Sequence, residues 1–442
     1  MRHCSFHLAA VVPALVGLLL GACTFTEPKA PRLEGKRVPV MVQGSNLRAD
    51  KALADTRIVV APPVANRAWA LAGGAATHAP YHLALGASPR RAFKVSAGRG
   101  STDERRLLAQ PVVDADGRIF VLDAHARIYV FDAKTGTRLW ARDLRPKEER
   151  EGTLGAGLAA VGGRVFVTTG FAQVLALDAG DGRVLWRKSL SAPFRSAPTV
   201  ADGRVFAVST DNRTHALEAE TGKELWTHRG TVEQASLLGG AAPAYERGTL
   251  VVAYSSGELF GLRAVDGREI WSDFLSQRRR TSGVGTIADI LASPVIDRGR
   301  VFAVSNSGYM VALSLASGTR IWQRRIGATS TPWSAGAYLY LVTTDNVLVC
   351  LRRRDGRVVW GRTLDRYQDE KKRRDWISWS GPVLAGDRLI LAGTNKQVLA
   401  VSPYTGDLLG RIKVADGVEI APIIARGTLY LLTRDAELIA WR

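Results

Sequence analysis

A six-residue motif that ends in tryptophan recurs along the chain and constrains the fold more than any other feature. Residues 221–226 read Thr-Gly-Lys-Glu-Leu-Trp, and similar copies end at Trp140, Trp186, Trp271, Trp322 and Trp360. A seventh, degraded copy ends at Gly410, where the tryptophan is missing. Consecutive copies are 38 to 51 residues apart, which is typical of a repeat architecture in which each repeat forms one structural unit.

Each repeat predicts four antiparallel strands. The repeat from Pro198 to Trp226 consists of short β-rich runs separated by Asp-Gly, Asp-Asn and Thr-Gly pairs, which are tight-turn sequences. Five repeats span 28 residues from their proline to the tryptophan position, whereas 10 to 23 residues separate one repeat from the next. A four-stranded block of fixed length with variable connectors is typical of a β-propeller blade, and the connectors are then expected on one face.

The two ends of the repeat region complement each other. The last repeat, after Pro422, contains three strands and lacks the fourth, while residues 91–95 show the alternation expected of that missing outer strand. Pairing of these segments would close the ring and leave no bare sheet edge at the seam. The sequence therefore predicts an all-β fold over residues 58–442: an eight-bladed β-propeller of four-stranded antiparallel blades, closed by an N-terminal strand in the C-terminal blade.

The N-terminal region predicts export and an anchor. Residues 1–22 carry Arg2 and an apolar run from Leu8 to Leu20, which is typical of a secretory signal peptide. The run ends in Leu-Gly-Ala-Cys and resembles a bacterial lipobox, which implies lipidation of Cys23. An ordinary signal peptide with an incidental cysteine is the alternative. Residues 23–57, with three prolines and little apolar periodicity, are interpreted as a lipidated tether.

The sequence predicts no catalytic, cofactor or metal site. Of three cysteines, Cys4 leaves with the signal peptide and Cys350 lies in an apolar run, so neither a disulfide nor a thiolate metal site is expected in the mature monomer. The polar pairs at 211–212 and 345–346 fall at tight-turn positions. The repeated indoles are interpreted as wedges between blades, because a cofactor would need one aromatic floor rather than six equivalent ones.

Basic residues dominate the charge. The formal net charge is +19, and removal of residues 1–22, whose one charged residue is Arg2, leaves +18. Such a surface favours acidic partners or anionic lipid surfaces, and nucleic acid is not expected for an exported chain. Two long connectors hold basic runs that we interpret as a candidate contact surface, with solvated loop decoration as the alternative. These runs are Arg278, Arg279 and Arg280, and Lys371, Lys372, Arg373 and Arg374.

The repeats, with their Ala176-Leu177-Asp178 segment, Asp-Gly turns and tryptophans, resemble the quinoprotein-type (PQQ-like) propeller repeat. Together with the lipobox, the Trp69…Gly73-Gly74 entry and a ring without a further domain, they make the chain similar to the BamB family. That resemblance implies a non-enzymatic lipoprotein of the outer membrane, facing the periplasm, in the β-barrel assembly (BAM) complex. The implied partners are the POTRA domains of BamA, other BAM subunits and nascent outer-membrane proteins.

The resemblance also implies a BamA-binding patch on the connectors before the fourth and fifth blades. Here Leu237 takes the place of the family's leucine and Asp289 that of the first of two acids. Leu238 stands where an arginine is expected, and Leu291 where the second acid should be. Leu237, Leu238 and Asp289 are therefore the predicted contact residues, with Asp289 expected at the surface. If Leu237 and Leu238 instead fill the gap between blades, they are structural.

Two other functions remain open at this point. One is a PQQ-dependent quinoprotein dehydrogenase, which would need clustered carboxylate and amide ligands for a calcium ion and an acid–base carboxylate at the ring centre. The sequence shows no adjacent cysteine pair and only short connectors, which argues against this class. The other is a lipid-anchored propeller scaffold that serves a different envelope complex.

Overall fold

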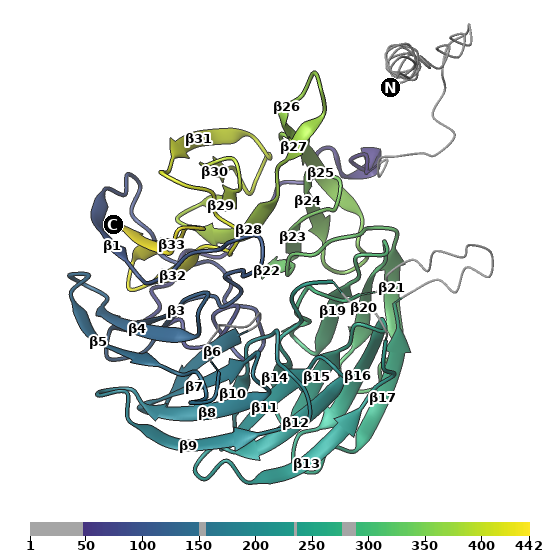
Figure 1. Ribbon diagram of the computed structural model, residues 1–442. Coiled ribbons are helices and arrows are strands. Elements are labelled where there is room, and N and C mark those ends of the chain that lie inside the picture. Colours follow the sequence, from purple (N-terminus) through teal and green to yellow (C-terminus); the bar gives the residue numbers. More distant parts are fainter. Residues whose placement is uncertain (1–46, 150–155, 234–236, 276–288) are drawn as a thin grey trace, which may run out of the picture. The chain divides into compact units, whose positions relative to one another are not determined.

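A computed structural model describes residues 47–149, 156–233, 237–275 and 289–442 (Figure 1). Its strands form eight four-stranded antiparallel sheets and one two-stranded hairpin arranged as a ring of blades. In seven of these sheets the first strand along the chain lies toward the ring axis and the fourth lies at the outer edge. The predicted propeller and its blade number are therefore confirmed.

Blades one to four comprise, in order from the axis outward, β2 (Val112–Val113), β3 (Arg118–Leu122), β4 (Arg127–Asp132) and β5 (Arg138–Asp143); β6 (Ala156–Val161), β7 (Arg164–Thr169), β8 (Gln173–Asp178) and β9 (Val184–Ser189); β10 (Thr199–Ala201), β11 (Arg204–Ser209), β12 (Arg213–Glu218) and β13 (Glu224–Arg229); β14 (Ala244–Glu246), β15 (Thr249–Ala253), β16 (Glu258–Arg263) and β17 (Glu269–Phe274). Blades five to seven comprise β18 (Val295–Asp297), β19 (Arg300–Val304), β20 (Met310–Ser314) and β21 (Arg320–Arg324); β22 (Trp333–Ala335), β23 (Tyr338–Val342), β24 (Val347–Arg352) and β25 (Val358–Thr363); β28 (Trp379–Ala385), β29 (Arg388–Gly393), β30 (Gln397–Val401) and β31 (Leu408–Lys413).

Blade eight is built from both ends of the ring region. Its strands are β32 (Ile423–Ala425), β33 (Thr428–Leu432), β34 (Glu437–Trp441) and, as the outermost strand, β1 (Arg91–Ser96). Phe93 pairs with Ala440 and Val95 with Leu438 in an antiparallel register. This pairing confirms the predicted seam.

Between regular blades, an indole on the outermost strand packs against the next blade, as predicted. Each indole Nε1–H donates to a backbone carbonyl of that blade at 2.7–3.2 Å, and a glycine with positive φ lies over the ring. A Cβ on any of these glycines would lie only 2.5–2.8 Å from an indole atom, so the turn requires glycine on steric grounds as well. The tryptophan–glycine pairs are Trp140–Gly182, Trp186–Gly222, Trp226–Gly267, Trp271–Gly318, Trp322–Gly356 and Trp360–Gly406.

The two junctions at the seam differ from this pattern. Gly410 replaces the tryptophan on blade seven, and a Cβ there would meet no atom within 4 Å. Phe93 on β1 lies under Gly136 of blade one, where a Cβ would come within 2.7 Å of the phenyl ring. The degraded motif thus faces blade eight. In that blade no turn joins the third and fourth strands, and the backbone of Arg90 instead pairs with that of Arg442.

Residues 64–85 run along the axial strands and are not part of any blade. The backbone of this inner segment makes hydrogen bonds with seven blades, with backbone groups in six of them and with the Trp333 indole in blade six. It therefore ties the axial strands together without repeating any motif. Its contacts, in order along the segment, are Asn66 with Arg426, Trp69 with Val113, Ala70 with Ala160, Ala76 with Tyr245, Thr77 with Ile296, Tyr81 with the Trp333 indole and Leu83 with Leu384.

Residues 47–57 belong to the folded body, which corrects their assignment to the tether. The amide of Asp50 donates to the carbonyl of Val358 on β25 at 2.9 Å, and its carboxylate pairs with Arg357 at 2.5 Å. The short 3₁₀ helix η1 (Lys51–Leu53) follows, and Leu53 is buried in the core. This segment covers the outer strand of blade six.

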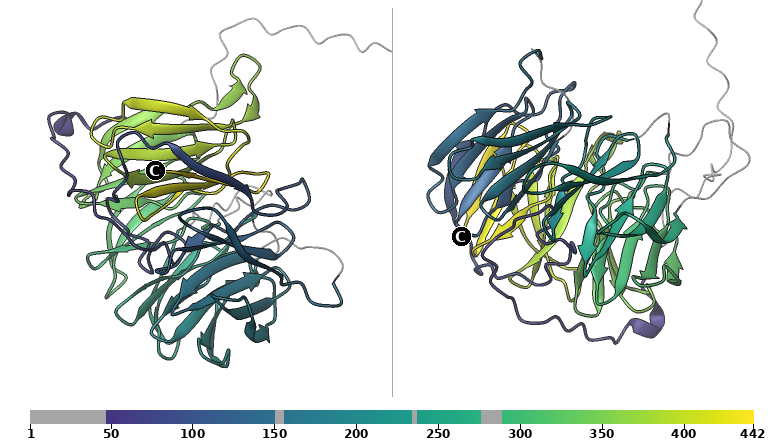
Figure 2. Two further views of the ribbon diagram at one scale, coloured as in Figure 1. Left: turned by 90° about the vertical axis from the view of Figure 1, so that its left-hand side faces the viewer. Right: turned by 90° about the horizontal axis from the view of Figure 1, so that it is seen from below.

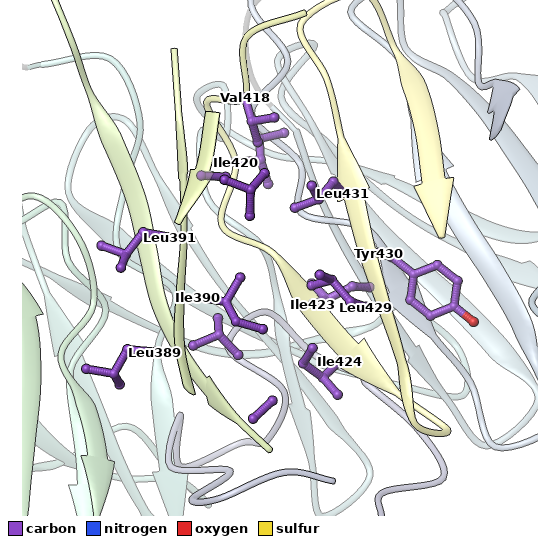
Figure 3. Close-up of a cluster of buried hydrophobic side chains, with 14 of the residues drawn as sticks. Leu389, Ile390, Leu391, Val418, Ile420, Ile423, Ile424, Leu429, Tyr430 and Leu431 are labelled. Carbon is purple, nitrogen blue, oxygen red and sulfur yellow. The ribbon is translucent and has the colours of Figure 1, made fainter. Parts of the chain in front are cut away.

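The core continues from blade to blade. Figure 3 shows part of it between β29 and strands β32 and β33, where aliphatic side chains from two neighbouring sheets face one another. Cys350 is a free, fully buried core cysteine, and burial raises the pKa of its thiol, as expected of a structural residue. In the part of the chain that the structure describes, no helix is long and apolar enough to cross a membrane.

Candidate partner-binding site

Two neighbouring connectors, before blades four and five, hold the predicted contact residues. Described residues 237–243 lead into β14, and residues 289–294 lead into β18. The amide of Ala242 donates to the Ser293 hydroxyl at 3.0 Å, so the two connectors are joined directly. The amide of Ser293 in turn donates to the Thr331 hydroxyl of the next connector at 3.1 Å. The blade order thus builds a continuous rim from connectors that the sequence separates by about 40 to 50 residues.

Asp289 lies under this rim rather than on it. Its side chain is 1% exposed, and one carboxylate oxygen accepts the backbone N–H of Leu237. Its backbone carbonyl accepts the N–H of Asn306 at 3.0 Å. The expectation that Asp289 is a surface residue is therefore wrong. The carboxylate instead fixes the position of the neighbouring connector, because it satisfies an amide that has no strand partner.

A small cavity separates Asp289 from blade three. It has a volume of about 40 Å³, enough for one or two water molecules, and is lined by Leu237, Asp289 and the half-buried Arg195 among others. The second carboxylate oxygen of Asp289 has no hydrogen-bond partner among the residues that the structure describes. Burial raises the pKa of Asp289, whereas the Leu237 N–H and the charge of Arg195 lower it. Arg195 was missed in the sequence because it lies on a third connector.

The two leucines differ in exposure. Leu237 is half-buried, whereas Leu238 is 41% exposed. Val232, at the start of the same connector, is 61% exposed. Gly239 follows with a φ of +115°, a conformation that suits glycine and turns the chain back toward the axis. The connector therefore presents apolar side chains next to a buried carboxylate that holds its backbone.

The second basic connector forms a hairpin that projects from the ring between blades six and seven (Figures 1 and 2). Its strands are β26 (Tyr367–Asp369) and β27 (Arg374–Trp376). Lys371, Lys372, Arg373 and Arg374 are exposed at or next to its tip, and Trp376 is 44% exposed. The hairpin belongs to a connector three blades beyond the Leu237 connector, so the structure does not merge the two sets of residues.

Two predicted features lie outside the described residues. Cys23 falls in the undescribed region 1–46, and Arg278, Arg279 and Arg280 fall within 276–288. Their lipidation and contact roles remain predictions.

A funnel of about 390 Å³ opens at the ring axis, where a quinoprotein dehydrogenase would need its acid–base carboxylate. Trp69 and Trp333 stack with ring centroids 6.3 Å apart at one wall, and His78 is buried beside them. Among the described residues that line it, Glu419 is the one carboxylate, and it pairs with Arg106 at 3.2 Å and Arg434 at 3.4 Å. No cluster of three or more acidic, histidine or cysteine residues suited to a metal occurs in the described ranges. These residues do not fit a calcium–quinone site.

The polar pairs noted in the sequence are structural. Asn212 and Asn346 have φ of +55° and +56° at strand turns, and both are buried. Each side-chain amide donates to a backbone carbonyl of the following connector at 2.6 Å, Asn212 to Thr231 and Asn346 to Ile377. They brace turns, because asparagine tolerates the left-handed conformation and can cap a loop.

The fold and its connectors define a propeller of the PQQ-repeat class whose candidate site lies on the connector rim. The family model described as "Outer membrane protein assembly factor BamB" matches residues 124–362 and 365–441, so the chain belongs to the BamB family. A relative of that name from Moranella endobia is 26% identical over 336 residues, covering 75% of this chain and 84% of the relative. One from Yersinia pestis is 27% identical over 360 residues, covering 80% and 89%.

Solved structures share the fold. BamB from Moraxella catarrhalis matches with a TM-score of 0.67 at 16% identity, covering 80% of this chain and all of that chain. Quinohemoprotein alcohol dehydrogenase from Comamonas testosteroni matches with a TM-score of 0.65 at 14% identity, covering 85% and 80%. The same ring therefore occurs in assembly factors and in dehydrogenases, and the fold alone does not separate the two classes.

Proposed function

We propose that the protein is a non-enzymatic scaffold lipoprotein of the outer-membrane β-barrel assembly complex. It is anchored in the outer membrane through a lipid on Cys23, faces the periplasm, and binds the POTRA domains of BamA. Through this contact, and contacts with other BAM subunits or nascent outer-membrane proteins, it assists insertion of outer-membrane proteins. Membership of the BamB family supports the assembly role.

The proposed binding site rests on one observation: the buried carboxylate of Asp289 holds the apolar connector that contains Leu237 and Leu238. Exposed Leu238 is suited to enter a pocket of the partner, because an apolar side chain on a fixed backbone loses little conformational entropy on binding. Leu237 and Asp289 set the position of that backbone through their hydrogen bond. In this proposal all three residues belong to the site, but Asp289 acts by positioning rather than by touching the partner.

Leu238→Ala tests the contact. We expect the affinity for purified BamA POTRA domains to fall about thirtyfold, which corresponds to about 2 kcal/mol for loss of an interface anchor. The melting temperature should stay unchanged, since the side chain is 41% exposed. Leu139→Ala is the matched control, because Leu139 is a leucine with 50% exposure on blade one. Equal affinities for both variants would place the contact elsewhere.

Asp289→Ala separates positioning from contact. The change leaves the buried amide of Leu237 without an acceptor, so we expect a loss of about 1–3 kcal/mol in stability together with weaker POTRA binding. A variant that loses binding at unchanged stability would instead indicate that the carboxylate meets the partner directly. Calorimetric melting and surface plasmon resonance on the same preparations give both quantities.

The quinoprotein dehydrogenase alternative has less support. The funnel residues do not supply a ligand cluster for calcium, and the named curated relatives are assembly factors. The dehydrogenases among the solved structures share the ring at 14% identity, which supports the fold and not the chemistry.

A further inference from the structure

A groove rich in arginine lies where the first described residues meet the junction of blades five and six. It has a volume of about 350 Å³ and is formed by residues 47–50, the end of β21 and the turn that precedes β25. Four of its lining residues are arginines and one is an acid, which gives a formal local charge of +3. These residues are Arg48, Arg324, Arg325, Arg357 and Asp50.

The arginines of this tether-side groove divide into two kinds. Arg324 donates to the carbonyl of Gly356 at 3.0 Å, and Arg357 pairs with Asp50 at 2.5 Å, so both help to fix the walls. Arg48 and Arg325 are exposed and form no ion pair with a described residue. The groove therefore combines a fixed wall with two guanidinium groups available to an anion.

The position of the groove indicates where such an anion would come from. Leu47 is itself a lining residue and lies 24 residues after Cys23. A chain of that length spans at most about 80 Å when fully extended. If Cys23 carries a lipid, which is part of the proposed function, a membrane surface is always within reach of this groove.

We propose that the tether-side groove binds the phosphate of an anionic lipid headgroup and holds the junction of blades five and six against the membrane. Guanidinium groups bind phosphate through two parallel hydrogen bonds, which favours arginine over lysine at such sites. The four arginines around one acid also complement the negative potential of an anionic leaflet. The contact gives the scaffold an orientation, which a lipid anchor alone cannot give.

The test uses the mature chain with Cys23→Ser, which removes the acyl chains and keeps every residue of the folded body. Its binding to phosphatidylglycerol-containing vesicles and to pure phosphatidylcholine vesicles is measured by co-sedimentation. Arg48→Gln with Arg325→Gln should weaken binding to the anionic vesicles about thirtyfold, since each arginine near an anionic surface contributes about 1 kcal/mol. Arg138→Gln with Arg183→Gln, two exposed arginines on blades one and two, is the control with the same charge change.

Three outcomes would overturn the proposal: no preference for anionic vesicles, equal losses in the groove and control variants, or release of the vesicles by inorganic phosphate at matched ionic strength. The last would assign the groove to a soluble anion. The groove variant should retain POTRA binding, because the groove lies away from the Leu238 connector. A failure of lipid binding therefore leaves the proposed assembly role standing, and loss of POTRA binding by Leu238→Ala leaves the lipid proposal standing.

Discussion

The outer and inner edges of the ring are held together in different ways. At the outer edge, one indole and one glycine turn recur at six junctions, so the same contact is made again and again. At the inner edge, residues 64–85 meet seven blades through a different hydrogen bond each time, six with backbone groups and one with the Trp333 indole. The outer contact is periodic and local to neighbouring blades, whereas the inner contact is unique and connects blades all around the axis.

This difference shows that repetition and closure are separate problems for a propeller. The repeated indoles pack each blade against the next, but they do not determine at which blade the ring closes. The seam and the inner segment supply that information, because each has one place to pair. At the seam, Gly410 stands in place of the tryptophan, and the following blade has no continuous turn between its last two strands.

Trp322→Ala should break the outer edge most severely. Trp322 is 7% exposed and its Nε1–H donates to the Arg353 carbonyl at 2.9 Å. Loss of a buried indole leaves a cavity and removes the shorter of two hydrogen bonds to that carbonyl, which also accepts from Arg300 at 3.5 Å, so we expect the free energy of unfolding to fall by about 3–5 kcal/mol. Urea unfolding followed by fluorescence measures the change. A loss below about 1 kcal/mol would show that the neighbouring blades hold the junction without the indole.

Acid should destabilise the inner edge of the ring through protonation of His78. Burial lowers the pKa of His78 to about 4, and its Nδ1 lies 2.7 Å from the carbonyl of Pro294. The unfolded chain binds a proton near the ordinary pKa of about 6.5, so stability is present above that pH and is lost as the pH falls toward 4. The loss attributable to this group is about 3 kcal/mol.

His78→Asn is the variant for this test. Asparagine tolerates the φ of +57° at this position and can still donate to the Pro294 carbonyl. Thermal melts of both proteins between pH 7 and pH 4 should show a steeper decline for wild type. Parallel declines would mean that the inner segment does not depend on a neutral imidazole.

Phe93→Ala tests the seam. Phe93 is half-buried and lies under Gly136 as the counterpart of the indoles. Because less of the ring is buried, we expect a loss of about 2 kcal/mol, roughly half the cost of removing a buried aromatic side chain. Hydrogen exchange should speed up in β34, which pairs with β1. Unchanged exchange there would place closure in the inner segment alone.

A pair of glycines isolates the smallest effect, the fit of turn to indole. Gly356 and Gly299 have φ of +66° and +73°, so alanine is strained at both. A Cβ at Gly356 would lie 2.7 Å from the Trp322 ring, whereas one at Gly299 meets no atom within 4 Å. Gly356→Ala should therefore cost about 1–2 kcal/mol more than Gly299→Ala in chemical unfolding. Equal costs would show that Gly356 is required only for its backbone conformation and not for its fit to the indole.

Much of the ring could be predicted from the sequence because its determinants are local. The Thr-Gly turn and the tryptophan in each repeat define strand number and length, and Trp226 marks the same register as Trp140. The seam was also predictable, since a blade lacking one strand and an isolated strand complement each other.

The inner segment and Asp289 could not be predicted in the same way. Residues 64–85 bind largely through backbone groups, which leave little trace in side-chain pattern. Residues 47–57 look like a linker because their contacts with β25 depend on a strand 300 residues away. Asp289 is buried because two connectors converge over it, and spacing from a proline does not indicate which side of a connector faces inward.

The pairing of β1 with β34 also has a consequence for the order of folding. Ala440 has to reach Phe93 across almost 350 residues, and the Asn66 side chain reaches Ile424 across 358. During synthesis and export the N-terminal strand emerges first and its partner last, so blades one to seven can assemble while the ring is still open. We expect closure to be the slow step, because bringing such distant segments together costs entropy before any contact is gained. Until then β1 is an unpaired edge, and the newly exported chain is most vulnerable to aggregation in that interval.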